Sequence, residues 1–272
     1  MRIFISLTIA FLLSPIASFA EIILVNQVQG GFLVSSAPTV TYVYRSQDPQ
    51  RTILYINGGD GKVGVKPDWD NHKYFTEYSF NIFLKRLTES DKTSGSSNVV
   101  VFDNPTSLDQ GDSYYPHPRG NTDHLIRVHS VVQHYAKLFN KPVWILGHSN
   151  GSASAAEYLA WLEKQKKDID IKGIIYASGA NGTKFPQGTK VPVMFIHHEK
   201  EGCVKYVTEA YSRGIYEKLK ADGNTKAEYF LASGGTPDPK YKNPCWGGHH
   251  TYFGAEEQVS KAIDEFLTKY SE

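Results

Sequence analysis

The pentapeptide Gly147-His148-Ser149-Asn150-Gly151 is the feature that most constrains the fold of this chain. It follows a compact apolar run, residues 143–146, and precedes a segment of small residues, 152–156. A G-x-S-x-G turn between a buried strand and a helix strains its central residue and lifts the hydroxyl above the sheet edge. A side chain at either glycine would crowd the turn or the helix behind it. Ser149 is therefore the candidate nucleophile; the alternative is a turn that only joins two elements.

The amino-terminal segment has the layout of a secretory signal peptide. Arg2 is followed by an apolar stretch over residues 3–19 and by the small residue Ala20, which predicts cleavage after Ala20. The stretch contains a proline and is shorter than the roughly 20 apolar residues that a spanning helix needs. We therefore expect a signal peptide over residues 1–20 and no stable membrane insertion after cleavage. The catalytic domain would be residues 21–272, and the protein would be periplasmic or secreted.

The length, composition and net charge of the chain indicate a globular protein and do not favour a nucleic-acid-binding one. The chain has 272 residues, of which 40% are hydrophobic and 21% charged, as is typical of a globular protein with one substantial core. It carries 29 basic and 28 acidic residues, and loss of residues 1–20 removes only Arg2, which leaves 28 of each. A neutral chain gives no electrostatic case for binding nucleic acid.

The chain contains two cysteines, Cys203 and Cys245. An even number of cysteines in an exported chain predicts one disulfide. Closing this 42-residue separation would stabilise the fold by about 4 kcal/mol on the loop-entropy model.

Apolar runs that predict buried strands alternate with amphipathic stretches that predict helices. The predicted strands are residues 40–44, 52–56, 99–102, 143–146, 173–177, 191–196 and 227–231. Several of them are continuously apolar, as are parallel strands covered on both faces. We therefore expect an α/β fold with a mostly parallel sheet and helices on both faces.

Two sets of apolar residues at helical spacing, here called stripes, and two loops complete the predicted α/β pattern. The stripes are Leu125, Val128, Val132, Tyr135 and Phe139, and Val259, Ala262, Ile263, Phe266 and Leu267. The connection between residues 177 and 191 is rich in glycine and proline, which leaves no room for a cap domain. The polar loop 103–121 follows the carboxyl end of a strand, and we interpret it as a pocket wall.

Activating a serine hydroxyl requires a histidine and a carboxylate. The segment after strand 191–196 offers two carboxylates, Glu199 and Glu201, and the segment 244–254 contains His249 and His250. The chain order of nucleophile, acid and histidine is characteristic of α/β-hydrolases.

On these motifs the mature chain resembles a lid-less α/β-hydrolase. It is similar to exported bacterial members with H-H-x-x-D-x-C after the penultimate catalytic strand and H-G-[FY]-x-G before the final helix. The resemblance puts Glu201 at the acid position and His250 at the base position. It departs from the pattern in that Glu201 replaces an aspartate and Thr251 replaces a glycine. The alternatives that stay open are Glu199 or Asp238 as the acid and His249 as the base.

The resemblance also implies an oxyanion hole made of two backbone N–H groups. One comes from Asn150, which follows the nucleophile, and the other from the glycine loop 57–61, at Gly59 or Asp60. A bridge between Cys203 and Cys245 would tie the acid loop to the histidine loop and restrict the drift of two catalytic groups.

Three other functions have some support in the sequence. Residues 59–64 match the dinucleotide-binding motif G-x-G-x-x-G, but residues 67–71 do not open a helix. Two histidine pairs suggest a metal site, yet adjacent residues at a strand end point to opposite faces. We expect no cofactor and no metal. The third possibility is a catalytically inactive binding protein that retains the fold.

The sequence therefore predicts a serine hydrolase that cleaves an ester through Ser149, His250 and Glu201 and an acyl-enzyme. An amidase or peptidase of the same fold is the alternative. The expected partner is a small-molecule ester or amide substrate.

Overall fold

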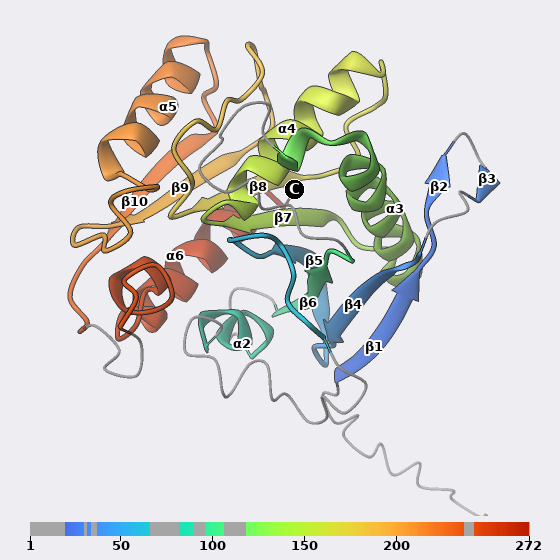
Figure 1. The fold of residues 1–272 in the computed structure, drawn as a ribbon, viewed down its shortest axis with the longest axis horizontal. Coiled ribbons are helices and arrows are strands. Elements are labelled where there is room, and N and C mark those ends of the chain that lie inside the picture. The colour runs from blue at the N-terminus through green and yellow to red at the C-terminus, as the bar shows by residue number, and fades with distance from the viewer. Residues whose placement is uncertain are drawn as a thin grey trace, which may run out of the picture.

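The computed structural model describes residues 20–29, 32–33, 37–65, 82–89, 96–105, 118–236 and 242–271. They form a central sheet with helices on both faces (Figure 1). Apart from Ala20, the predicted signal peptide lies outside these residues.

The main sheet has eight strands in the order β1-β4-β6-β5-β7-β8-β9-β10. Their bounds are Ala20–Val25 (β1), Thr39–Tyr44 (β4), Pro49–Ile56 (β5), Ser96–Asp103 (β6), Val143–His148 (β7), Gly173–Ala177 (β8), Val193–His198 (β9) and Ala227–Ala232 (β10). The pairs β1–β4 and β4–β6 are antiparallel, and all pairs from β6 to β10 are parallel. A separate two-stranded ribbon joins Val28–Gln29 (β2) to Phe32–Leu33 (β3). The predicted α/β fold with a mostly parallel sheet is confirmed.

All seven predicted strands are present, and β5 and β6 each begin three residues earlier than predicted. Two further differences concern β1 and β9. Strand β1 was not predicted, because its apolar residues directly follow the apolar segment assigned to the signal peptide. Strand β9 begins and ends two residues later than predicted. His197 and His198 are therefore strand residues and lie on opposite faces of the sheet.

The central strands are buried on both faces, which explains their continuous apolar sequences. Within β5, Leu54 and Ile56 belong to one buried cluster, and Ile53 and Tyr55 to the other. The first cluster packs under Thr122–Phe139 (α3), Gly151–Lys164 (α4) and Glu209–Ala221 (α5). The second packs under Ile82–Thr88 (α2) and Glu256–Lys269 (α6), on the opposite side of the sheet in Figure 1.

The two predicted helical stripes lie in these clusters. In α3 the residues Leu125, Val128, Val132 and Tyr135 are buried, and in α6 Val259, Ile263, Phe266 and Leu267 are buried. The side chain of Asn121 caps α3 by accepting a hydrogen bond from the N–H of Asp123.

The connection between β8 and β9, residues 178–192, contains turns and no helix, so no cap domain is inserted there, as predicted. Of the predicted pocket wall, residues 106–117 lie outside the described residues, and the short 3-10 helix η2, Pro118–Gly120, follows them. None of the helices in the described ranges combines the length and the apolar character needed to cross a membrane.

Candidate active site

Ser149 occupies a tight turn between the end of β7 and the start of α4. Its φ of 53° lies in the left-handed region, which is rare for a residue with a side chain and is a form of stored strain. Its N–H donates to the carbonyl of Ala177 at 2.9 Å, and its own carbonyl accepts from the N–H of Ser152 at 3.1 Å. These bonds to the neighbouring strand and to the first turn of α4 hold the strained conformation.

The two glycines of the pentapeptide are required by packing. A Cβ on Gly147 would lie 2.5 Å from the carbonyl oxygen of Gly151. A Cβ on Gly151 would lie 2.0 Å from the carbonyl oxygen of Ile56, in the neighbouring strand β5. Both distances are far below van der Waals contact, so this turn can pack against the sheet only with glycine at both positions.

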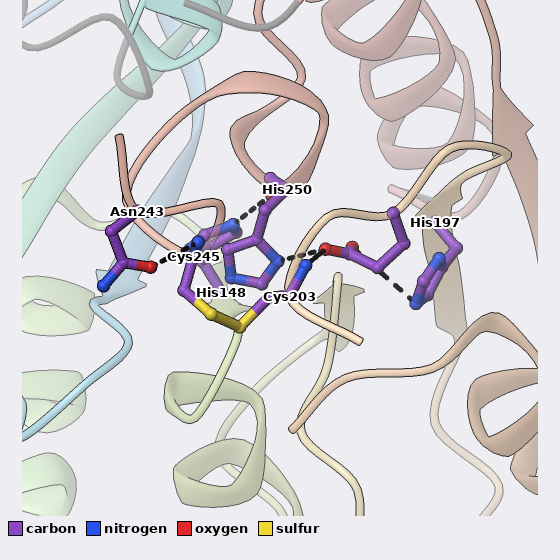
Figure 2. Close-up of a disulfide and its surroundings, with 7 residues drawn as sticks. His148, His197, Cys203, Asn243, Cys245 and His250 are labelled. Carbon is purple, nitrogen blue, oxygen red and sulfur yellow. Dashed lines mark hydrogen bonds and ion pairs between the residues drawn. A yellow bond between two sulfur atoms is a disulfide. The ribbon is translucent and has the colours of Figure 1, made fainter. Parts of the chain in front are cut away.

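Glu201 and His250 lie next to each other at the same edge of the sheet. Glu201 is in the turn that follows β9, and His250 is in the 3-10 helix η3, Gly248–Thr251. The His250 Nδ1 and the Glu201 Oε1 are 2.9 Å apart, and the two side chains are 1% and 4% exposed. Figure 2 shows this contact beside the disulfide.

Glu201 is held in its ionised form. Burial raises the pKa of Glu201, but the hydrogen bond and charge of His250 and the N–H of Cys203 outweigh burial. The resulting pKa is about 2, so the carboxylate is charged at neutral pH. A buried anion that receives the Nδ1–H of a histidine fixes the tautomer of the ring and leaves Nε2 unprotonated.

The competing candidates lie elsewhere. Glu199 is exposed, and its Oε1 lies 3.5 Å from the N–H of Gly234. The ring of His249 stacks on that of His198, with the centroids 4.5 Å apart. Asp238, the third candidate for the acid, lies outside the described residues.

His148, the residue before Ser149, connects the serine turn to His250. Its Nε2 lies 2.9 Å from the backbone carbonyl of His250, and the ring centroids are 4.8 Å apart (Figure 2). Burial and, to a smaller extent, the nearby His250 ring lower the pKa of His148 to about 3, although the hydrogen bond to the His250 carbonyl and the charge of Glu201 act in the opposite direction. His148 is therefore neutral and donates its Nε2–H. In the sequence His148 is recognisable only as the second residue of the G-x-S-x-G motif, and no local pattern indicates this contact.

His197, labelled in Figure 2, is the second histidine that lies close to Glu201. Its side chain is fully buried, and its Nε2 is 4.0 Å from the Glu201 Oε2. Burial lowers the pKa of His197, which favours the neutral ring. Glu201 thus lies close to two imidazoles, one of them at hydrogen-bond distance.

A disulfide joins Cys203 to Cys245, as the sequence predicted, with the Cα atoms 4.5 Å apart. Cys203 also donates its N–H to Glu201 at 2.8 Å, and the N–H of Cys245 donates to the Asn243 side chain at 2.9 Å (Figure 2). The bridge therefore links the turn that carries Glu201 to the segment that leads into His250.

The glycine loop after β5 lies against the serine. A Cβ on Gly58 would lie 2.8 Å from the Cβ of Ser149 and 3.3 Å from its Oγ. The side chain of Asn150 donates to the carbonyl of Gly59 at 2.9 Å. The predicted oxyanion residues Gly59, Asp60 and Asn150 thus belong to two segments in direct contact around Ser149.

The rival motifs have a different structural context. Residues 59–64, which match G-x-G-x-x-G, form turns and irregular backbone without a helix. Asp103, at the end of β6, holds the end of this loop by accepting from Val63 and Val65 at 2.7 and 2.8 Å. Within the described part of the chain, no group of three or more His, Cys, Asp or Glu side chains is placed to hold a metal ion.

Comparisons with known proteins identify the fold. No protein-family model and no curated protein matches the sequence. An esterase from Pyrococcus furiosus has a TM-score of 0.59 at 12% identity, over 93% of this chain and 94% of that chain. Carboxyl esterase 2 from the fungus Tuber melanosporum has a TM-score of 0.60 at 12% identity, over 94% of this chain and 88% of that chain. A serine hydrolase without a lid from Xanthomonas campestris has a TM-score of 0.57 at 10% identity, over 93% of this chain and 95% of that chain.

At these low identities the similarity establishes the α/β-hydrolase fold, in agreement with the strand order and the helices on both faces. The activity has to be argued from the residues of the site.

Proposed function

We propose that this protein is a serine hydrolase that cleaves carboxylic esters through an acyl-enzyme. The observation that carries the proposal is the 2.9 Å contact between His250 and the ionised Glu201, in a site where His148 connects His250 to the Ser149 turn. A histidine held in this way can act as a general base towards a hydroxyl group.

The first step is attack by the serine. Because the Nδ1–H of His250 is donated to Glu201, the Nε2 carries the lone pair that accepts the hydroxyl proton. As the proton leaves, Ser149 Oγ bonds to the carbonyl carbon of the ester, and the carbonyl oxygen becomes an oxyanion. The negative charge of Glu201 stabilises the imidazolium that forms.

Backbone amides stabilise the oxyanion in this proposal. The N–H of Asn150 is one donor, and the N–H of Gly59 or Asp60 is the other. The close approach of Gly58 to Ser149 and the hydrogen bond between the Asn150 side chain and Gly59 support this assignment, because they bring the two segments together.

The second half of the reaction restores the enzyme. The tetrahedral intermediate collapses, its bond to the alkoxide oxygen breaks, and His250 donates its Nε2 proton to the leaving alcohol. A water molecule, deprotonated by His250, then attacks the acyl group on Ser149. The second intermediate releases the carboxylic acid, and Ser149 regains its proton.

The preference for an ester and the export of the protein rest on separate support. Two of the structural neighbours are described as esterases, which favours an ester of a small molecule over an amide. The disulfide and the predicted signal peptide favour a periplasmic or secreted protein, because disulfides persist in oxidising compartments.

A kinetic panel tests the proposed function. The purified mature chain and the Ser149→Ala variant are assayed on p-nitrophenyl esters of short and long acids and on the matching anilides. We expect ester turnover that falls by about 10⁶-fold in Ser149→Ala, as in other serine hydrolases that lose the nucleophile. Faster cleavage of the anilides would indicate an amidase or peptidase. A parent that cleaves none of these substrates would indicate a binding protein, and equal measurable rates in the parent and Ser149→Ala would rule out Ser149 as the nucleophile.

A further inference from the structure

Arg119, in the short helix η2, lies directly beneath the glycine loop. Its side chain is fully buried. The two N–H groups of one guanidinium nitrogen, Nη2, are shared among three successive backbone carbonyls, those of Asn57, Gly58 and Gly59, at 3.1, 3.3 and 2.9 Å. Nη1 donates to the Ser154 hydroxyl, in helix α4, at 3.1 Å.

These contacts fix the direction of the loop amides. In a planar trans peptide, the carbonyl of one residue and the N–H of the next point in opposite directions. Arg119 draws the carbonyls of Asn57, Gly58 and Gly59 towards itself, so the N–H groups of Gly58, Gly59 and Asp60 point away from the guanidinium. The last two are the alternatives proposed for the second oxyanion donor.

A buried hydrogen-bond chain supports the same loop from both ends. The Ser154 hydroxyl lies 2.9 Å from the His124 Nε2, and the His124 Nδ1 lies 3.0 Å from the Asn104 side-chain oxygen. The N–H of Asn104 in turn donates to the carbonyl of Gly61 at 3.3 Å. The glycine loop is therefore attached to α3, α4 and the end of β6 as well as to Arg119.

The charge of Arg119 lies close to the place where negative charge would develop. Burial lowers the pKa of Arg119 to about 10, and Asp60 partly offsets this effect, so the guanidinium remains charged at neutral pH. A fixed cation behind the peptide groups polarises them and makes their N–H groups stronger donors in a site of low dielectric.

A second buried arginine provides a contrast. Arg51 forms an ion pair with Asp264 in α6 and also donates to the Ser97 hydroxyl. These contacts join β5 and β6 to α6 and are expected to contribute to stability alone. Three of the four contacts of Arg119 described above are instead made to backbone carbonyls of the glycine loop, and the fourth is made to the Ser154 hydroxyl.

We propose that Arg119 is a positioning residue that orients the backbone amides of Gly59 and Asp60 towards the oxyanion. This inference rests on the proposed function. It predicts that Arg119 affects the chemical step more than substrate binding, because the oxyanion exists only in the tetrahedral intermediate and the transition states that flank it.

The test compares Arg119→Lys with Arg51→Lys as the matched control. Lysine keeps the charge but lacks the planar fork of donors. For the best ester of the panel, kcat of Arg119→Lys should fall by about 10² to 10³-fold, the loss typical of one oxyanion donor, with KM within about threefold. The affinity for an aryl boronic acid, whose serine adduct carries a tetrahedral anion, should fall with kcat. Arg51→Lys should lower the melting temperature and leave kcat unchanged.

The outcomes separate the two proposals. If the parent protein cleaves no ester, the proposed function fails. If the parent is active but Arg119→Lys keeps the parental kcat and boronate affinity, the positioning role is wrong. If Arg119→Lys does not fold, Ser154→Ala replaces it. This variant should lower kcat and boronate affinity together, and parental values would overturn the proposal.

Discussion

The Nε2 of His148 and the backbone carbonyl oxygen of His250 are 2.9 Å apart, although the two residues are 102 positions apart in the sequence. The neutral ring of His148 donates this hydrogen bond because burial keeps its pKa near 3. The turn that carries Ser149 is thereby joined to the backbone of the proposed base. We therefore expect the distance between Ser149 and His250 to depend in part on this bond.

His148→Ala should therefore impair catalysis. We expect kcat to fall by about 10 to 100-fold with little change in KM, because displacements of about 1 Å in a catalytic group have effects of this size. Steady-state kinetics on the best ester provide the measurement, with His134→Ala in α3 as the control. A parental kcat in His148→Ala would contradict the positioning of His250 by this residue.

Glu201 and Glu199 differ sharply in their surroundings, so their glutamine variants should differ as well. Glu201→Gln should lower kcat by about 10⁴-fold, because an amide cannot stabilise the imidazolium formed during attack. The kcat of Glu199→Gln should stay within about twofold of the parental value, since substitutions of exposed residues usually have small effects. If the two variants lost activity equally, the assignment of Glu201 as the acid would have to be abandoned.

The Cys203–Cys245 disulfide should affect both stability and turnover. Replacing both cysteines with serine should lower the free energy of unfolding by about 2 to 4 kcal/mol, as is usual for a native bridge. Because the bridge joins the Glu201 turn to the segment before His250, kcat should also fall. Chemical denaturation and kinetics measure the two effects. A loss of stability without any loss of kcat would limit the bridge to a structural role.

Stability should decrease in acid, partly through Glu201. The folded pKa of Glu201, about 2, lies below the ordinary value of 4.5, so the folded state binds its proton less readily than the unfolded state. The contribution of ionised Glu201 to the free energy of unfolding is complete above about pH 4.5 and is lost as the pH falls towards 2. Denaturation curves across this range should show a shallower decrease for Glu201→Gln than for the parent. If stability fell equally with pH in the parent and in Glu201→Gln, Glu201 would not contribute to the loss of stability in acid.

Much of the fold could be predicted because the signals are local. Continuous apolar runs indicated strands β4 to β10 of the main sheet, and the glycines of the pentapeptide indicated the turn at Ser149. The disulfide followed from the number of cysteines and the expected export. The strands and the turn depend on residues that are close in sequence, and the disulfide depends on the number of cysteines.

The site could be predicted only in part, because its contacts join distant segments. The spacing of Glu199 and Glu201 does not separate them in the sequence, because residues two apart point to the same side of an extended segment. The chain instead turns there, with the N–H of Glu201 donating to the carbonyl of His198 at 3.2 Å. Arg119 and His148 were missed because their contacts, to residues about 60 and 102 positions away, depend on the tertiary fold.

Covalent labelling of Ser149 is the most direct test of the central claim. The parent protein, His249→Ala, His250→Ala and Ser149→Ala are treated with a fluorophosphonate, and the labelled peptide is mapped by mass spectrometry. The account predicts rapid labelling at Ser149 in the parent and in His249→Ala, labelling slowed by several orders of magnitude in His250→Ala, and none in Ser149→Ala. Labelling at another serine, or an unlabelled parent protein, would contradict it.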